Sequence, residues 1–174
     1  MLELLAPAGN LDAVIAAVQN GADAVYMGFG DGFNARRGAD NFTQEAFAKA
    51  VRYCHIRGCK VYVTLNTLVG DREMDAAAAL AQQASDAGAD AILVQDLGLA
   101  RVLRAALPDI PLHASTQMSI HNLAGVEAAA EMGITRAVLA RELSLEQIRF
   151  ISQHASIETE VFVHGALCFC HSGQ

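Results

Sequence analysis

A short phrase recurs along the chain: an Ala-rich stretch with amphipathic spacing, then a glycine, then a short run of mostly apolar residues. The glycines are Gly21, Gly58, Gly88 and Gly133, and each stands shortly ahead of such a run. Glycine at a helix C-terminus takes the left-handed conformation without a Cβ clash. A short run that is apolar on both sides is typical of a parallel strand covered on both faces. The repeated phrase therefore predicts alternating helices and parallel strands.

The pattern predicts strands and helices in strict alternation. The strands are expected at Leu2–Leu5, Ala24–Met27, Val61–Thr64, Ala91–Val94, Leu112–Ala114, Ala137–Ala140 and Glu160–Val163. The helices are expected at Asp12–Gln19, Thr43–His55, Asp75–Ala87, Gly98–Ala106, Leu123–Glu131 and Ser144–His154. Thr43 and Ser144 precede acidic or amide residues, so both are expected to be helix N-caps.

Strand–helix alternation of this kind favours a parallel sheet with right-handed crossovers. A barrel is favoured over a doubly wound sheet, because the turn after the first strand is Pro7-Ala8-Gly9-Asn10 and not a glycine-rich phosphate loop. A complete barrel has eight strands and typically about 250 residues. The predicted fold is therefore α/β, a parallel (β/α) TIM-type barrel truncated after about seven strands. Residues 1–174 would form one incomplete barrel domain that ends inside a cysteine motif.

Composition narrows the class of protein. Hydrophobic residues make up 53% of the chain, yet no run approaches the roughly 18–20 apolar residues of a membrane helix. Glu3, Pro7 and Asn10 interrupt the start, which is unlike a secretory signal peptide. We therefore expect a cytoplasmic protein without a membrane span. The net charge of −7, from 12 Lys and Arg against 19 Asp and Glu, weighs against tight nucleic-acid binding by this chain alone.

Polar residues follow the predicted strands at the ends where barrel enzymes bind their substrates. Contact with solvent explains any single one of them, but the dense segments His113–Gln117 and Ala140–Glu142 predict a polar pocket. Arg141 is suited to hold a carboxylate or phosphate through its guanidinium. No catalytic residue is assigned. The predicted substrate-pocket residues are Asn10, Tyr26, Arg36, Asn66, Gln95, Asp96, His113, Thr116, Gln117, Arg141, Glu142 and His164.

The segment between the second strand and Thr43 is long and rich in glycine, and it carries Arg36 and Arg37. Its functional interpretation is a lid that recruits an anion, and the alternative is a solvated surface loop.

The end of the chain carries the densest cluster of metal-ligand residue types. His164, Cys168, Cys170 and His171 follow the last predicted strand, which suggests a metal or iron–sulfur ligand loop. A Cys–His nucleophile remains an alternative. The other two cysteines, Cys54 and Cys59, are interpreted as core thiols.

Several segments together resemble the collagenase-like peptidase family, a peptidase family of unknown catalytic type. The family signature is Glu-x-x-x-His-Gly-Ala-Leu-Cys followed by Ser-Gly-x-Cys, and Glu160–Cys168 with Ser172-Gly173 match it. The further matching segments are Glu3–Asn10, Asp23–Gly28, Phe33 with Arg36, Asn41-Phe42, Thr64–Thr67, Val94–Gly98, His113–Gln117 and Leu139–Glu142.

The resemblance implies an iron–sulfur protein in which four cysteines hold a [4Fe-4S] cluster. It also implies support of the hydroxylation of an RNA base or a ubiquinone precursor, with prephenate as a small anionic partner in some members. Cys168 would be the first cluster ligand, and the next would follow Gln174. Cys170 stands where members more often have a small or hydroxyl residue and is not counted as a ligand. We therefore expect the cluster in the intact parent protein and none in this chain.

Three hypotheses follow for function. The first is cluster-dependent hydroxylation by the intact parent, in which this chain alone would be inactive. The second is a peptidase, as the family name says, and the third is a non-catalytic half-barrel that binds a partner. Because a barrel short of its eighth strand leaves strand edges open, we also expect the chain to self-associate through Leu2–Leu5 or Glu160–Gln174.

Overall fold

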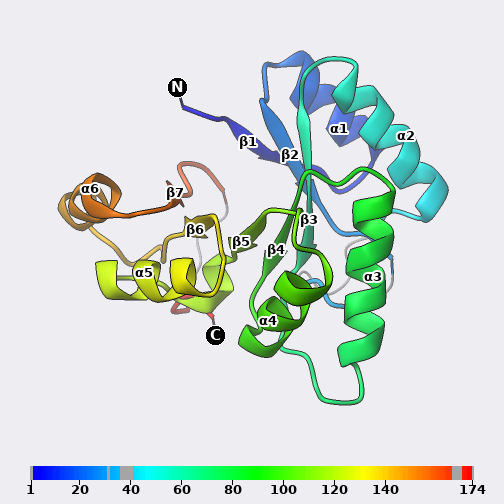
Figure 1. Ribbon diagram of the computed structural model, residues 1–174. Helices are drawn as coiled ribbons and strands as arrows, with labels where there is room; N and C mark the ends of the chain where they lie inside the picture. Colours follow the sequence, from blue (N-terminus) through cyan, green and yellow to red (C-terminus); the bar gives the residue numbers. More distant parts are fainter. Residues whose placement is uncertain (1, 31, 36–40, 166–169, 174) are drawn as a thin grey trace. The chain divides into compact units, whose positions relative to one another are not determined.

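The computed structural model describes the chain except for residues 1, 31, 36–40, 166–169 and 174. Seven parallel strands run through the described residues, in the order β1-β2-β3-β4-β5-β6-β7 (Figure 1). This order follows the chain without the reversal of a doubly wound sheet. The predicted parallel (β/α) barrel-type fold is therefore confirmed.

Helices and strands alternate from β1 to β7. The strands are β1 Leu5–Pro7, β2 Ala24–Met27, β3 Lys60–Leu65, β4 Ala91–Val94, β5 Leu112–Ala114, β6 Arg136–Val138 and β7 Glu158–Glu160. The helices are α1 Leu11–Gln19, α2 Gln44–His55, α3 Met74–Asp86, α4 Leu97–Ala106, α5 Leu123–Glu131 and α6 Leu145–His154, with a 3₁₀ turn η1 at Thr116–Met118.

The chain forms two compact units, Met1–Ile92 and Leu93–Gln174. We call them the N-terminal and the C-terminal unit and describe each by itself. The boundary falls within β4, between Ile92 and Leu93.

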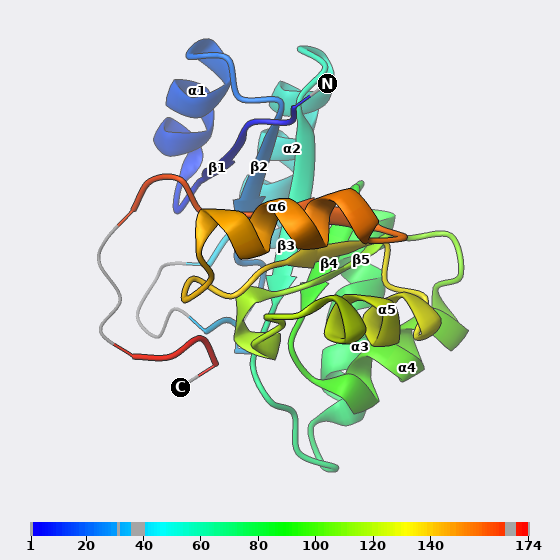
Figure 2. The same cartoon turned by 90° about the vertical axis from the view of Figure 1, so that its left-hand side faces the viewer.

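The N-terminal unit is built on β1, β2 and β3. Val25 of β2 pairs with Ala6 of β1 and with Val61 of β3, so the three strands share one parallel register. Helices α1 and α2 pack against each other (Figures 1 and 2). Phe47 of α2 is fully buried in the core that these strands line. Cys54 and Cys59 are buried in the same core, so their interpretation as core thiols is confirmed.

In the C-terminal unit, β6 lies between β5 and β7. Ala137 pairs with Ala114 on one side and with Thr159 on the other. Ala114, Ala137 and Val126 of α5 are all buried. This unit carries the segments His113–Gln117 and Ala140–Glu142 and the end of the chain.

The predicted helix N-caps are confirmed. The Thr43 hydroxyl accepts a hydrogen bond from the Ala46 amide at 3.3 Å. The Ser144 hydroxyl accepts from the Gln147 amide at 3.2 Å, while the Gln147 side chain accepts from the Ser144 amide at 2.8 Å. This second pair is a complete capping box, which satisfies amide groups that have no partner within the helix.

The first and last strands lie elsewhere than predicted. We expected β1 at Leu2–Leu5, but it spans Leu5–Pro7, and Leu2 is 97% exposed. The Asp23 carboxylate accepts a hydrogen bond from the Leu4 amide at 2.7 Å and so pairs the chain just ahead of the strand. We expected β7 at Glu160–Val163, but it spans Glu158–Glu160. Both predictions followed the most apolar run, whereas cross-strand pairing set the strand limits.

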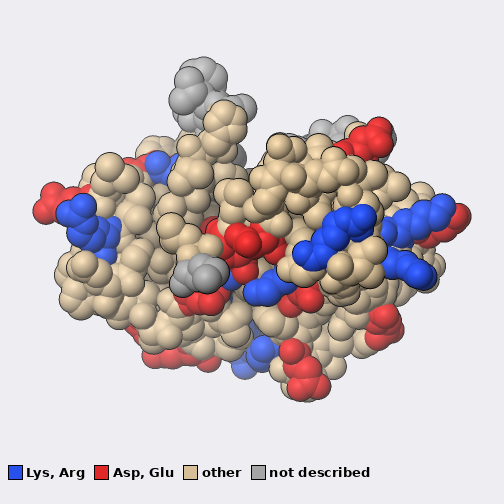
Figure 3. All heavy atoms as spheres, turned by 90° about the horizontal axis from the view of Figure 1, so that it is seen from above, with Lys and Arg blue, Asp and Glu red and all other residues tan. Residues whose placement is uncertain are grey.

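The surface carries both signs of charge. Figure 3 shows Lys and Arg side chains interspersed with Asp and Glu on the face that it displays. Among the described residues, no helix has both the length and the apolar character needed to cross a membrane.

Candidate functional site

In the N-terminal unit, the predicted pocket residues Asn10 and Asn66 follow strands β1 and β3, and both have a clear local role. The Asn10 side chain caps α1 by accepting from the Ala13 amide at 2.9 Å. The Asn66 side chain, directly after β3, accepts from the Ala35 amide at 3.0 Å. Tyr26 is half-buried within β2. Asn10 and Asn66 therefore order the loops beside these strand ends.

The loop after β2 has a fixed base. Phe29 forms a parallel bridge with Phe42, and its ring packs at 4.6 Å from the ring of Phe47. Asn34 donates to the Asn41 side chain at 3.2 Å across the loop. Arg36, the predicted anion-recruiting residue of this loop, lies outside the described residues. The lid interpretation stays a prediction.

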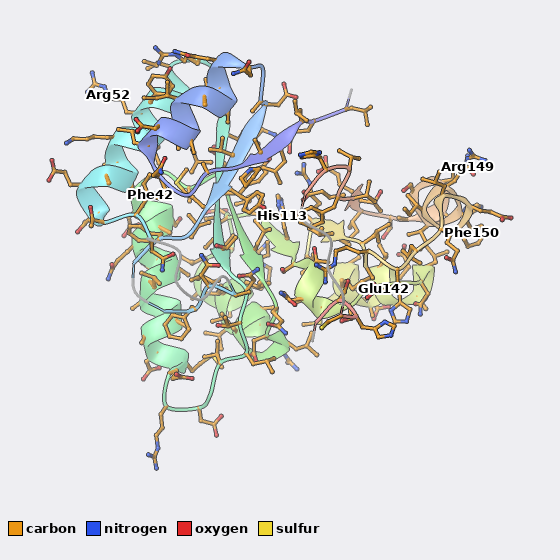
Figure 4. The ribbon with its side chains drawn as sticks, turned by 180° about the vertical axis from the view of Figure 1, so that it is seen from behind. Phe42, Arg52, His113, Glu142, Arg149 and Phe150 are labelled. Carbon is orange, nitrogen blue, oxygen red and sulfur yellow. The ribbon has the colours of Figure 1, made fainter. Side chains whose placement is uncertain are left out.

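In the C-terminal unit, the residues after β4 and β5 combine capping with burial. Asp96 caps α4 by accepting from the Leu99 amide at 2.8 Å, and Gln95 beside it is half-buried. His113 lies within β5 and is buried (Figure 4). Thr116 and Gln117 form the η1 turn at the end of this strand.

Arg141 and Glu142 come together with a residue from the far end of the chain, Ser172. The Ser172 hydroxyl donates to the Glu142 carboxylate at 3.0 Å, and the Ser172 amide donates to the other oxygen of the same carboxylate. The Arg141 amide and Nε donate to the Ser172 hydroxyl at 3.2 and 3.4 Å. The Ser119 hydroxyl donates to the Ser172 carbonyl oxygen. Ser172 is thereby buried, with 4% of its surface exposed.

The next residue, Gly173, fits only because it lacks a side chain. Its φ is +87°, a conformation that favours glycine. A Cβ at this position would lie 2.8 Å from the Gln117 carbonyl oxygen, which is closer than real Cβ contacts come. The Ser-Gly pair of the signature therefore matches the surface formed by the loops after β5 and β6.

These contacts also set the charge state of Glu142. The Ser172 amide hydrogen bond is the main reason that the pKa of Glu142 falls from its ordinary 4.5 to about 2. The Ser172 hydroxyl and the imidazole of His171 act in the same direction, and His171 lies 3.5 Å from the carboxylate. Glu142 is therefore a carboxylate throughout the neutral range.

The cysteine motif cannot be assembled into a metal site from the described residues. Cys168 lies outside them, while Cys170 is an exposed free thiol and His164 is exposed. Cys54 and Cys59 are buried, and burial raises the pKa of the Cys54 thiol to about 12. No group of three or more His, Cys, Asp and Glu in the described part of the chain could hold a metal ion. A cluster that needs four thiolates does not fit this set of donors.

The pocket residues therefore separate by unit, and the best-defined cluster includes two residues that the sequence did not single out for the pocket, Ser119 and Ser172. Asn10, Tyr26 and Asn66 belong to the N-terminal unit. The C-terminal unit brings together Arg141, Glu142, Ser119 and the Ser-Gly pair. The sequence did contain a signal for Ser172, because the family signature includes a serine at this position.

Comparison with known proteins gives consistent relatives. The profile of peptidase family U32 matches residues 9–174. The chain is 44% identical over 173 residues to the 23S rRNA 5-hydroxycytidine C2501 synthase of Escherichia coli (strain K12), covering 99% of this chain and 26% of that protein. It is 41% identical over 172 residues to tRNA hydroxylation protein P1 of Bacillus subtilis (strain 168), covering 99% of this chain and 40% of that protein.

The chain thus spans about a quarter and two fifths of the lengths of these two relatives. Among solved structures, a U32 peptidase superimposes with a TM-score of 0.76 at 17% identity, covering 92% of this chain and 68% of that chain. At this identity, the structural likeness shows the shared fold alone.

Proposed function

Because the chain belongs to peptidase family U32, we propose that it is part of a protein that supports the hydroxylation of an RNA base. The observation that carries the proposal is the 44% and 41% identity, over nearly the whole chain, to two proteins named for rRNA and tRNA hydroxylation. We also infer a cytoplasmic location, because the cytoplasm contains both rRNA and tRNA.

The geometry supports this proposal through the C-terminal unit. Ser172 and Gly173 of the signature lie against the loops after β5 and β6, at the strand ends where barrel proteins bind substrates. The contacts of His171 and Ser172 with Arg141 and Glu142 thus bring the two residues that follow Cys170 to this pair. A [4Fe-4S] cluster of the whole protein, which would supply redox chemistry, stays part of the proposal. It would need thiolates beyond those of the described residues.

The experiment is a comparison of RNA from cells that contain or lack the protein. Total rRNA and tRNA are digested to nucleosides, and hydroxylated nucleosides are quantified by mass spectrometry. Loss of one hydroxylated nucleoside in the deletion strain, restored by the gene, is the expected result. Unchanged levels of every hydroxylated nucleoside in both RNA classes would refute the proposal.

The second candidate is peptidase activity, which the family name favours. Hydrolysis of gelatin by the purified protein, measured by release of new amino termini, separates this function from the first. Gelatin hydrolysis together with unchanged hydroxylated nucleosides would favour the peptidase.

A further inference from the structure

We propose that Glu142 is a positioning residue that anchors the cysteine-bearing end of the chain. Its carboxylate, with Arg141 and Ser119, forms a receptor for Ser172 and Gly173, which we call the anchor. The functional part of this inference rests on the proposed RNA hydroxylation. The anchoring itself rests on the contacts of the C-terminal unit.

The anchor holds Ser172 through every polar group that this residue has. The amide and hydroxyl bind the two oxygens of Glu142, the hydroxyl also accepts from Arg141, and the carbonyl oxygen accepts from Ser119. These partners come from two separate loops, so they fix both the position and the orientation of the peptide. A carboxylate acceptor makes such hydrogen bonds stronger than neutral ones.

Gly173 extends the anchor by one residue. It packs against the Gln117 backbone so closely that any side chain would collide with the carbonyl oxygen. The motif residues Gln117, Arg141 and Glu142 therefore meet the chain's own terminal segment. This is a different role from the direct substrate contact expected from the sequence alone.

Anchoring restricts the position of the Cys170 thiol, which precedes it. Cys170 lies two residues before Ser172, and two residues of extended chain span at most about 7 Å. The Glu142 carboxylate also meets the His171 imidazole at 3.5 Å. Removing the anchor would release residues 170–173 without changing any cysteine. A loss of function in such a variant would therefore come from lost positioning and not from a lost metal ligand.

Hydrogen–deuterium exchange of residues 170–173 tests the anchoring. The variants are Glu142→Gln, Ser172→Ala and the double variant, and the matched control is Glu146→Gln, an exposed carboxylate in the first turn of α6. We expect exchange roughly tenfold faster in Glu142→Gln, because charge-assisted hydrogen bonds are lost. The double variant should add little to the single ones, because both remove the same contacts.

In all four proteins α4 should remain protected from exchange, as expected if the core stays folded. Native exchange at 170–173 in Glu142→Gln, or a fully additive double variant, would overturn the anchoring. Glu142 and Ser172 lie outside the helices and strands, and none of the substitutions changes an apolar core residue, so folding of the core is not at stake.

The nucleoside assay on the same variants tests the positioning role. Loss of the hydroxylated nucleoside in Glu142→Gln, with Glu146→Gln active and α4 protected from exchange in both, supports it. Full modification by Glu142→Gln would overturn it. If the native protein leaves RNA unmodified while Glu142→Gln exchanges faster, only the proposed function fails and the anchoring stands.

Discussion

At the scale of single residues, the glycines that end the helices differ in what surrounds them. Gly21 and Gly133 both have positive φ, at +91° and +81°. A Cβ at Gly21 would meet nothing within 4 Å, whereas one at Gly133 would lie 2.6 Å from Cδ of Arg104. Arg104 cannot easily move away, because it donates to the carbonyl oxygens of Leu107 and Ile110.

Replacement of these two glycines by alanine should therefore have unequal effects. We expect Gly21→Ala to lower the free energy of unfolding by about 1 kcal/mol, the cost of the left-handed conformation alone. Gly133→Ala should lower it by about 2–3 kcal/mol, since steric overlap adds to that cost. Urea denaturation of both variants provides the measurement. Equal losses would show that the Arg104 side chain moves aside at no cost in free energy.

The Glu142 carboxylate gives a prediction on pH. Its pKa in the folded chain is about 2, below the ordinary 4.5, because Ser172 and His171 favour the charged form. A depressed folded-state pKa means stabilisation that is complete above the unfolded value and lost as the pH falls through the folded one. We therefore expect the anchor to persist at pH 5 and to loosen between about pH 4 and pH 2. The Ser172 amide signal in NMR spectra should titrate in that range, and a midpoint near 4.5 would contradict it.

At the scale of elements, β7 shows how pairing overrides apolar pattern. Arg136 of β6 has a side chain only 9% exposed, and its guanidinium binds Glu158 at 2.6 Å and Glu160 at 3.4 Å. The two glutamates are two positions apart in β7, so their side chains lie on the same face of the strand, where both reach Arg136. A buried guanidinium needs such partners, so the strand forms at Glu158–Glu160 and leaves the more apolar Val161–Val163 exposed.

This arrangement predicts a large effect of Arg136. We expect Arg136→Ala to lower the free energy of unfolding by about 2–3 kcal/mol, because the mostly buried Glu160 loses its ion pair with the guanidinium. Arg149→Ala, at an exposed position of α6, is the matched control and should change it by less than about 0.5 kcal/mol. Chemical denaturation measures both. A similar small change in the two variants would mean that the ion pairs contribute little.

The helices were predicted from the sequence to within one residue at either end, because capping and amphipathic spacing are local signals. The strand order also followed from the repeated phrase. What the sequence could not show was non-local: the Arg136 ion pairs that place β7, and the return of Ser172 to Glu142 thirty residues earlier. Motif density singled out the loop of Arg141 and Glu142, but it did not predict that Ser172 binds there.

At the scale of the whole molecule, charge limits what the chain can bind alone. All charged residues between Ala46 and Gly70 are basic: Lys49, Arg52, Arg57 and Lys60. Lys49 is paired with Glu45 at 2.8 Å, and Lys60 with Glu3 at 3.0 Å. Within a chain of net charge −7, this leaves Arg52 and Arg57 as the cations of the stretch that are outside these pairs.

We expect this chain to bind single-stranded RNA weakly, with a shallow salt dependence. Each phosphate neutralised contributes about −0.7 to the slope of log K against log salt, so two arginines give a slope near −1.4. Fluorescence anisotropy between about 50 and 200 mM salt measures it. Arg52→Ala with Arg57→Ala should bring the slope toward zero, while Arg101→Ala with Arg149→Ala, both exposed and in the C-terminal unit, should leave it unchanged. A slope of −4 or steeper would require a basic surface larger than this stretch, and would place RNA binding elsewhere on the chain.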